Sequence, residues 1–125
     1  MSNEKLSRFT GQKYLNLETY RKNGTAVPTP VWFAEDAGVL YIYSLANAGK
    51  VKRIRNNPRV RVMPCDMRGN QKGEWVDGVA RILNAAGAER AHKLLDKKYG
   101  WIKKIGGLYS KLMKRERAAM AIELD

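Results

Sequence analysis

The sequence predicts a small, mainly β domain of the α+β class, an antiparallel β-barrel flanked by two or three helices. About six segments are expected to form strands, and the first of them, over 13–20, alternates apolar and polar residues with the period of two that is typical of a half-buried strand. Strong turn signals separate several of them, and only two or three segments have helical spacing. With 125 residues, of which 44% are hydrophobic and 9% aromatic, the chain is expected to form one packed domain over residues 1–125.

The first half of the chain is expected to form a three-stranded meander. Asn23 and Gly24 are a strong hairpin signal, because both central positions of a type I′ turn need positive φ. The expected elements are a strand over 13–20, a strand over 25–34, a turn over 35–38 and a strand over 39–45.

The second half is expected to alternate helices with strands. Pro58 ends a short helix, Asn84 is an expected N-cap, and Gly100 is expected just after the end of a longer helix. The expected elements are a helix of about two turns within 47–58, a strand over 59–67, a loop over 68–73, a strand over 74–83, a helix over 84–100, an amphipathic helical segment over 101–115 and a strand over 118–124.

The formal net charge of +12 is concentrated in two segments. Residues 47–72 hold eight Lys/Arg against one acid, and residues 90–117 hold ten against two. Both segments are expected to face something anionic, and phosphate, nucleic acid and an anionic membrane all satisfy this charge.

Several kinds of site are disfavoured by composition. A single cysteine, Cys65, excludes an intramolecular disulfide, and a single histidine, His92, argues against a Cys/His metal site or a histidine-based triad, so no metal is expected. His92 is predicted on the solvated side of its helix. No apolar run is long enough for a membrane span and no signal peptide is recognised, so we expect a cytoplasmic protein.

Residues 47–60 carry five basic side chains and no acid. Gly49 precedes a short helix, whose first N–H groups and partial positive charge favour an anion, and Lys50 falls in its first turn. Lys52 and Arg53 cannot both point the same way as Lys50, because helix neighbours diverge by about 100°. The pattern favours a cradle for one phosphate, with a simple solvated basic face as the alternative.

Pro28 and Pro30 lie two residues apart within the strand predicted over 25–34. They remove two N–H donors from one edge, whereas Thr29 and Val31 can still pair on the other. One interpretation is an edge strand protected against association with other chains. The other is that the side chains within 29–33 form a flat wall for a planar ligand.

The stretches "KYLNLETYRKNGTAVPTPVWF" (13–33) and "LYIYSLANAGKVKRIRNNPRVRVMPCDMRGNQKGEWVDGVARIL" (40–83) carry a family resemblance. The chain resembles the FMN-binding split β-barrel superfamily that includes pyridoxamine 5′-phosphate oxidase, and within it the short branch of PPOX-class oxidoreductases that depend on coenzyme F420, a deazaflavin. The resemblance is clear over 13–83 and looser elsewhere. It implies a homodimeric split barrel that binds coenzyme F420, with FMN as the alternative.

The resemblance also implies which residues hold the cofactor. Lys50 with the backbone around Gly49 and Val51 would hold its phosphate, and the remaining implied contacts are Thr29, Pro30, Val31, Trp32, Tyr43, Ser44, Lys52 and Arg53, with Arg61 and Trp75 supplied across the dimer interface. Ala48 and the Pro-rich second strand stand where many FMN oxidases have basic residues, which favours the deazaflavin.

The implied activity is a flavin-type oxidoreductase that transfers hydride to an unsaturated or quinone-like small molecule, without an assigned catalytic side chain. An FMN-binding split-barrel protein or a flavin reductase is the alternative within the superfamily. The non-enzymatic alternative is a basic module for nucleic acid or an anionic membrane. No nucleic-acid partner is expected, and residues 101–115 could additionally contact anionic lipid.

Overall fold

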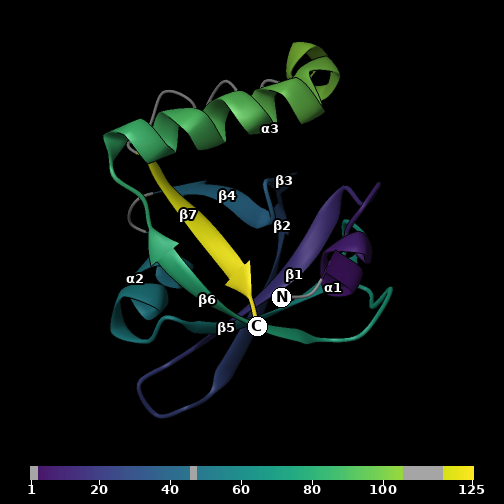
Figure 1. The fold of residues 1–125 in the computed structure, drawn as a ribbon. Helices are drawn as coiled ribbons and strands as arrows, with labels where there is room; N and C mark the ends of the chain where they lie inside the picture. The colour runs from purple at the N-terminus through teal and green to yellow at the C-terminus, as the bar shows by residue number, and fades with distance from the viewer. Residues whose placement is uncertain (1–2, 46–47, 106–116) are drawn as a thin grey trace.

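Seven strands form one antiparallel sheet in the computed structural model, which describes residues 3–45, 48–105 and 117–125 (Figure 1). The strand order is β2-β1-β5-β6-β7-β4-β3, and the sheet curls around an apolar interior. This confirms the predicted mainly β, antiparallel barrel class. The strands are β1 (Tyr14–Tyr20), β2 (Ala26–Trp32), β3 (Ala34–Asp36), β4 (Val39–Leu45), β5 (Arg59–Cys65), β6 (Val76–Ile82) and β7 (Arg117–Leu124).

The sheet closes at Phe33. Strands β2 and β3 are separated only by Phe33, yet they lie at opposite edges of the strand order. The chain therefore steps from one edge to the other within a single residue, which brings the two edges together. The strand predicted as continuous over 25–34 is wrong in this respect, because the chain changes its pairing partner at Phe33.

The turn predicted over 35–38 is also shorter than expected. Glu35 and Asp36 belong to β3 and pair with Leu40 and Val39 of β4. The turn consists of residues 37–38, which have φ values of 51° and 84°. Positive φ at both positions is what a two-residue type I′ hairpin requires.

Strand β2 is an edge strand within the described residues, where it pairs only with β1. The N–H of Arg21 donates to the carbonyl of Thr25, and the alternation along an antiparallel ladder then assigns the β1-facing groups to residues 27, 29 and 31. The nitrogens of Pro28 and Pro30 consequently face the open edge. This confirms that β2 is an edge strand with its two prolines on the open side.

Two helices complete the barrel core. Helix α2 (Gly49–Asn56) buries Val51 and Ile54 among the interior side chains of the sheet, and α1 (Asn3–Ser7) is followed by the buried Phe9. Helix α1 was not predicted, since its five residues are too short for a periodic signal. No helix in the described parts of the chain is both long and apolar enough to cross a membrane.

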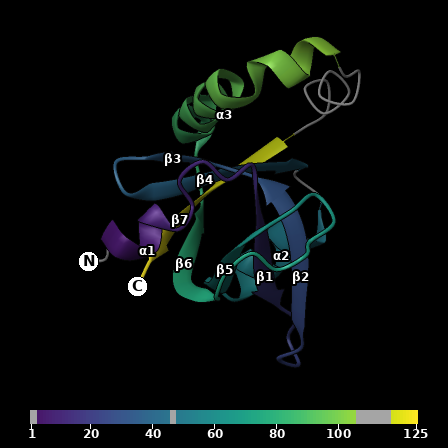
Figure 2. The same ribbon diagram turned by 90° about the vertical axis from the view of Figure 1, so that its right-hand side faces the viewer.

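Helix α3 (Ala85–Ile105) lies across the end of the sheet remote from the β1–β2 hairpin (Figures 1 and 2). Asn84 is its N-cap as predicted, because its Oδ1 accepts a hydrogen bond from the Gly87 N–H at 2.9 Å. The predicted end at Gly100 is wrong, because the helix continues to Ile105. An interior glycine costs a helix only about 1 kcal/mol, which does not force termination. Most of the predicted segment 101–115 lies outside the described residues.

His92 does not lie on the solvated side of α3. Its ring is half-buried and 5.6 Å from the ring of Tyr43 on β4. His92 is one position from the fully buried Ala91 and three from the buried Leu95, so it falls within the arc that faces the sheet. The sequence prediction of a surface histidine is corrected here.

The second half of α3 stabilises the strand step, the point at Phe33 where the chain passes from β2 to β3. Tyr99 is 2% exposed and stacks on Trp32 with ring centroids 4.8 Å apart and an interplanar angle of 8°. Its hydroxyl accepts the Phe33 N–H at 3.3 Å and can donate to the carbonyl of Lys13 at 2.5 Å or of Phe33 at 2.9 Å. The Phe33 carbonyl also accepts from Lys98 Nζ at 2.8 Å.

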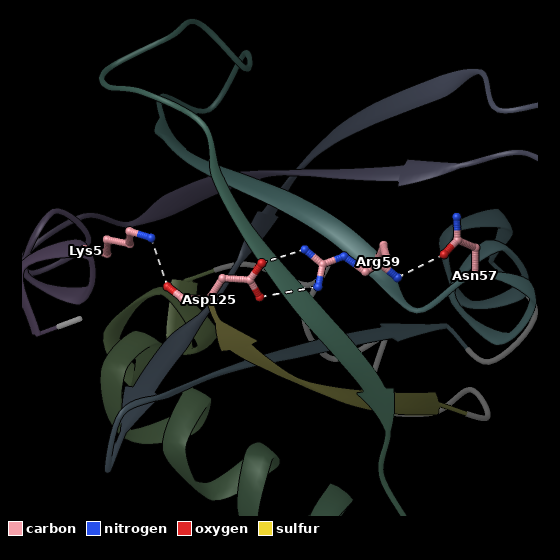
Figure 3. A network of polar contacts seen from close by, with 4 residues as sticks. All are labelled: Lys5, Asn57, Arg59 and Asp125. Carbon is pink, nitrogen blue, oxygen red and sulfur yellow. Dashed lines mark hydrogen bonds and ion pairs between the residues drawn. The ribbon is translucent and has the colours of Figure 1, made fainter. Parts of the chain in front are cut away.

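A polar network joins β5, β7 and α1 on the surface (Figure 3). The Arg59 guanidinium binds both carboxylate oxygens of Asp125, at 2.6 and 3.4 Å, and Lys5 donates to the Asp125 carbonyl at 3.0 Å. The hydrogen bond from Arg59 holds the pKa of Asp125 below its usual range. The network thus ties α1 to the end of β7.

Asp125→Asn is expected to lower the stability slightly at pH 7, because it removes an exposed ion pair with Arg59. The folded-state pKa of Asp125 is depressed, so its contribution is present above the unfolded value of 3.8 and is lost as the pH falls through the folded value. Urea unfolding of both proteins should therefore differ at pH 7 and converge below pH 3.8. A difference that persists unchanged at low pH would contradict this assignment.

Candidate functional site

The start of α2 is a positively charged helix end without an acidic cap. The N-cap Ala48 has extended backbone angles and offers no side-chain hydrogen bond, and the first turn holds no acidic residue. The Ala48 carbonyl accepts from the N–H groups of Val51 and Lys52. The first N–H groups of a helix have no carbonyl partner within it, so this end favours an anion.

Three cationic side chains gather at this helix end, namely Lys50, Arg53 and Arg21. The Arg53 guanidinium folds back over Gly49, where an added Cβ would be 2.7 Å from Arg53 Nη1, and Arg53 Nε donates to Oγ1 of the fully buried Thr19 at 2.6 Å. Arg21, in the turn after β1, is the third cation and acts on Arg53 through its charge. None of the three forms an ion pair with a carboxylate in the described part of the chain.

Arg21, Lys50 and Arg53 are called the cationic cluster below, and burial and mutual repulsion lower the pKa values of two of them. Burial and then the Arg53 charge lower the pKa of Lys50. Burial and then the Arg21 charge lower the pKa of Arg53. A bound anion would relieve both costs, since it screens the repulsion and replaces lost hydration.

The other predicted residues of α2 differ in what they offer. The Val51 side chain is fully buried in the core, so only its backbone is available to a ligand at the helix start. Lys52 is exposed and Arg55, one turn along, is exposed as well. The structure therefore brings Gly49, Lys50 and Arg53 together and leaves Lys52 apart from them.

The predicted wall on β2 is divided between the two faces of the strand. Thr29 and Val31 alternate with Pro30 and Trp32, so the two pairs point to opposite sides. Val31 is buried in the barrel interior, and Trp32 packs on Tyr99 of α3. A ligand that lies along this edge would touch one pair by side chain and the other through the backbone.

Tyr43 and Ser44 lie near the end of β4 and face opposite sides of the sheet. Tyr43 packs against His92 and against neighbouring apolar residues of α3. Ser44 is 4% exposed, and its Oγ has no hydrogen-bond partner among the described residues. A buried hydroxyl without a partner is costly unless a ligand or water satisfies it.

Arg61 and Trp75 form a separate cluster on the outer face of β1 and β5. The Arg61 guanidinium binds the Glu18 carboxylate through Nε at 2.8 Å and Nη2 at 2.7 Å and lies 5.0 Å from the Trp75 ring centroid. Glu18 is 5% exposed and also accepts from the Tyr20 hydroxyl at 3.0 Å. The hydrogen bond to Glu18 raises the pKa of Arg61. Arg61 is therefore already engaged with Glu18 within the monomer.

The described surface also contains two cavities that include none of the predicted cofactor residues. One of about 610 Å³ lies along α3 beside the ion pair of Arg90 with Asp36. The other, of about 260 Å³, lies between the segment after α1 and the strand step, with Lys98 on its lining.

Sequence reasoning missed one member of the cationic cluster, Arg21, and one of its contacts, Thr19. Thr19 reads as an interior strand position and Arg21 as part of a hairpin, and neither has a local signal that relates it to α2. Their approach depends on how the β1–β2 hairpin packs against α2, which is a tertiary feature. The helix start itself had a local signal, namely a glycine before a basic turn.

Comparison with known proteins gives the relationships of the whole chain. A family profile described as pyridoxamine 5′-phosphate oxidase matches residues 2–125. A search of curated proteins gives no significant match. The heme storage protein HutZ from Vibrio cholerae is similar in structure, with a TM-score of 0.75 and 14% identity over 99% of this chain and 89% of that one.

Two further solved structures share the fold. A FAD-binding protein from Mesorhizobium loti has a TM-score of 0.65 and 21% identity, covering 100% of this chain and 88% of that one. An F420 reductase has a TM-score of 0.61 and 21% identity, covering 95% of this chain and 91% of that one. At these identities the likeness establishes the fold alone.

Proposed function

Because the chain belongs to the pyridoxamine 5′-phosphate oxidase family, a group of FMN-binding split barrels, we propose that it is a cofactor-dependent oxidoreductase whose cofactor is coenzyme F420. FMN is the alternative cofactor. Residues 1–125 would act as one flavin- or deazaflavin-binding domain. The observation that carries this proposal is the cationic cluster at the uncapped start of α2, where three half-desolvated or exposed cations face no carboxylate among the described residues.

The cluster fits the anionic part of such a cofactor. Lys50 and Arg53 would each contribute a charge-assisted hydrogen bond, and the backbone at Gly49 and Val51 would add N–H donors. Gly49 has a second role, because any side chain there would displace the Arg53 guanidinium. Arg21 and the exposed Lys52 would extend the positive surface toward a longer anionic tail.

The ring of the cofactor would lie against the edge formed by β2 and the end of β4. The open edge of β2 has no N–H donors at Pro28 and Pro30. The side chains of residues 29–32 would line this edge. The Ser44 hydroxyl, which has no partner among the described residues, fits a polar atom of the ring system. Tyr43 would contribute packing beside Trp32, since both rings pack against the same apolar cluster on α3.

A homodimer would complete the site, because a planar ring on an open strand edge needs a second wall. Arg61 and Trp75 lie on the outer face of the sheet, and we propose that they cover the cofactor of the other subunit. Arg61 is held by Glu18, whose carboxylate also accepts from the Tyr20 hydroxyl, so Arg61 would enter the interface with its geometry already set.

When bound, coenzyme F420 would supply hydride chemistry toward an unsaturated or quinone-like small molecule. The chain's own residues would hold the anionic tail, orient the ring and exclude water from one of its faces. We assign no side chain as proton donor.

Lys50→Ala is expected to weaken binding of coenzyme F420 by roughly 10- to 100-fold, because a charge-assisted hydrogen bond contributes about 1.5–3 kcal/mol. Cofactor fluorescence measured during titration with purified protein checks this. Arg55→Ala is the matched control, since it removes one exposed positive charge from the same helix. It should leave the affinity within about twofold of the unmodified protein.

Parallel titration with FMN decides between the two cofactors. Tighter binding of FMN than of coenzyme F420, with the same dependence on Lys50, would transfer the proposal to a flavin oxidoreductase. Indifference to both cofactors would overturn it. Light scattering checks the dimer, and a monomer that still binds the cofactor tightly would refute the role given to Arg61 and Trp75.

A further inference from the structure

Lys98 places an ammonium group on the lining of the 260 Å³ cavity, away from the cationic cluster. Its Nζ donates to the Phe33 carbonyl at 2.8 Å and lies 3.7 Å from the centroid of the Phe33 ring. Both contacts favour the protonated amine. Neither of them supplies a negative charge, and no carboxylate of the described residues forms an ion pair with Lys98.

The rest of the cavity is mainly apolar. Leu6 and Phe9 enter from α1 and the turn after it, and Phe33 enters from the strand step. Phe9 and Phe33 are 2% and 1% exposed and pack edge to face with centroids 5.9 Å apart. Thr10 and Gly11 complete one rim, and the exposed Glu35 is the one acidic residue on the lining. The cavity therefore combines one cation with rigid aromatic walls.

We propose that this cavity is a binding site for a small carboxylic acid with a short apolar or aromatic body, with Lys98 as its counter-charge. The volume of 260 Å³ is slightly below the range of about 300–1,000 Å³ that is typical of sites for larger drug-like ligands. The apolar body would pack on Leu6 and Phe9. The carboxylate would take the N–H donors of Lys98 that the Phe33 carbonyl leaves free.

The protonation of Lys98 makes this proposal testable by pH. Burial lowers the pKa of Lys98 to about 8. The titratable groups beside it are the Glu35 carboxylate on β3 and the Tyr99 hydroxyl on α3, and burial raises the pKa of Tyr99 so that it stays neutral. Lys98 is therefore expected to lose its charge as the pH rises through about 8, whereas the Tyr99 hydroxyl keeps its proton.

The experiment is an NMR titration of the full chain with benzoate, and with benzamide as the neutral analogue of the same shape. Shifts of the backbone amides of Phe33, Glu35 and Tyr99 report binding. Benzoate is expected to bind more tightly than benzamide at pH 6.5 and to lose at least about tenfold in affinity by pH 9.5, whereas benzamide stays unchanged. A lysine with an ordinary pKa would leave benzoate almost unchanged over this range.

Two variants sharpen the test. Lys98→Met keeps an apolar stem and should abolish the preference for benzoate over benzamide, whereas Lys97→Met, at the exposed neighbouring position, should keep it. Glu35→Gln should strengthen benzoate binding, because it removes the repelling carboxylate. Equal affinity for benzoate and benzamide in the unmodified protein, or no binding of either, would overturn the proposal even if Lys98→Met failed to fold.

This site is independent of the proposed cofactor site. Lys98→Met should bind coenzyme F420 as the unmodified protein does, and Lys50→Ala should bind benzoate normally. Failure of one proposal would therefore leave the other intact.

Discussion

Tyr99→Ala is expected to lower the free energy of unfolding by about 3–5 kcal/mol, the range found when large buried aromatic residues are truncated. The ring is 2% exposed and stacks on Trp32, so its removal opens a cavity between α3 and the strand step. It also leaves the Phe33 N–H without its acceptor. Urea unfolding followed by circular dichroism measures the change.

Tyr99→Phe separates the hydroxyl from the ring. The ring stack with Trp32 is kept, whereas the Phe33 N–H and the Lys13 carbonyl lose their hydrogen bonds. A buried polar group that is left without a partner costs about 1–3 kcal/mol, so this variant should lie between the unmodified protein and Tyr99→Ala. Stability within 0.5 kcal/mol of the unmodified protein would show that the hydroxyl does not fasten the strand step.

Gly78→Val is expected to destabilise the protein by about 3 kcal/mol or more. Gly78 lies in the middle of β6, paired with Val60 on one side and Leu124 on the other. An added Cβ would be 2.8 Å from the Glu123 carbonyl oxygen and 3.3 Å from Ile122 Cγ2. Backbone cannot yield without breaking the β6–β7 ladder, and overpacking of this kind typically costs about 1–3 kcal/mol for one or two added groups.

Alanine at Gly78 and at Gly49 forms the matched comparison. The added Cβ at Gly49 would meet only the end of the Arg53 side chain, at 2.7 Å, and a flexible side chain can move aside. Gly49→Ala should therefore change the stability by less than about 0.5 kcal/mol, whereas Gly78→Ala should cost about 1–3 kcal/mol. Equal loss of stability in both variants would contradict the backbone clash at Gly78.

Local patterns predicted most of the strands, and the errors have a common cause. The β1–β2 hairpin, the prolines of β2 and the Asn84 cap each depend on a few neighbouring residues, and each was found where it was expected. The predicted type I′ turn is wrong, because only Gly24 of the pair Asn23-Gly24 has a positive φ, and the hydrogen bond from the Arg21 N–H to the Thr25 carbonyl closes a three-residue loop. The step at Phe33 has no local signal, because residues on both sides of it favour strands. It is fixed by Tyr99, which is 66 residues away in the chain. His92 was misplaced because the sheet-facing arc of α3 is wider than its apolar residues suggested.

In the candidate site, too, the feature with a local sequence signal was predicted and the features that depend on tertiary packing were not. A glycine followed by basic residues marks the start of α2 locally, and the structure has a helix beginning at Gly49. The approach of Arg21 and Thr19 to Arg53 depends on packing between the hairpin and α2, which no short stretch encodes. Lys98 has the spacing of an ordinary solvated lysine, and its cavity exists only because the segment after α1 folds over Phe33.

The two edge strands of the sheet, β2 and β3, are successive in the polypeptide and are joined by Phe33 alone. Neither edge strand can separate from the sheet alone, because its displacement is transmitted through Phe33 to the other. Local unfolding at this junction is thus concerted, and the amide protons of β2 and β3 should exchange with solvent at a shared rate although the strands lie at opposite ends of the strand order.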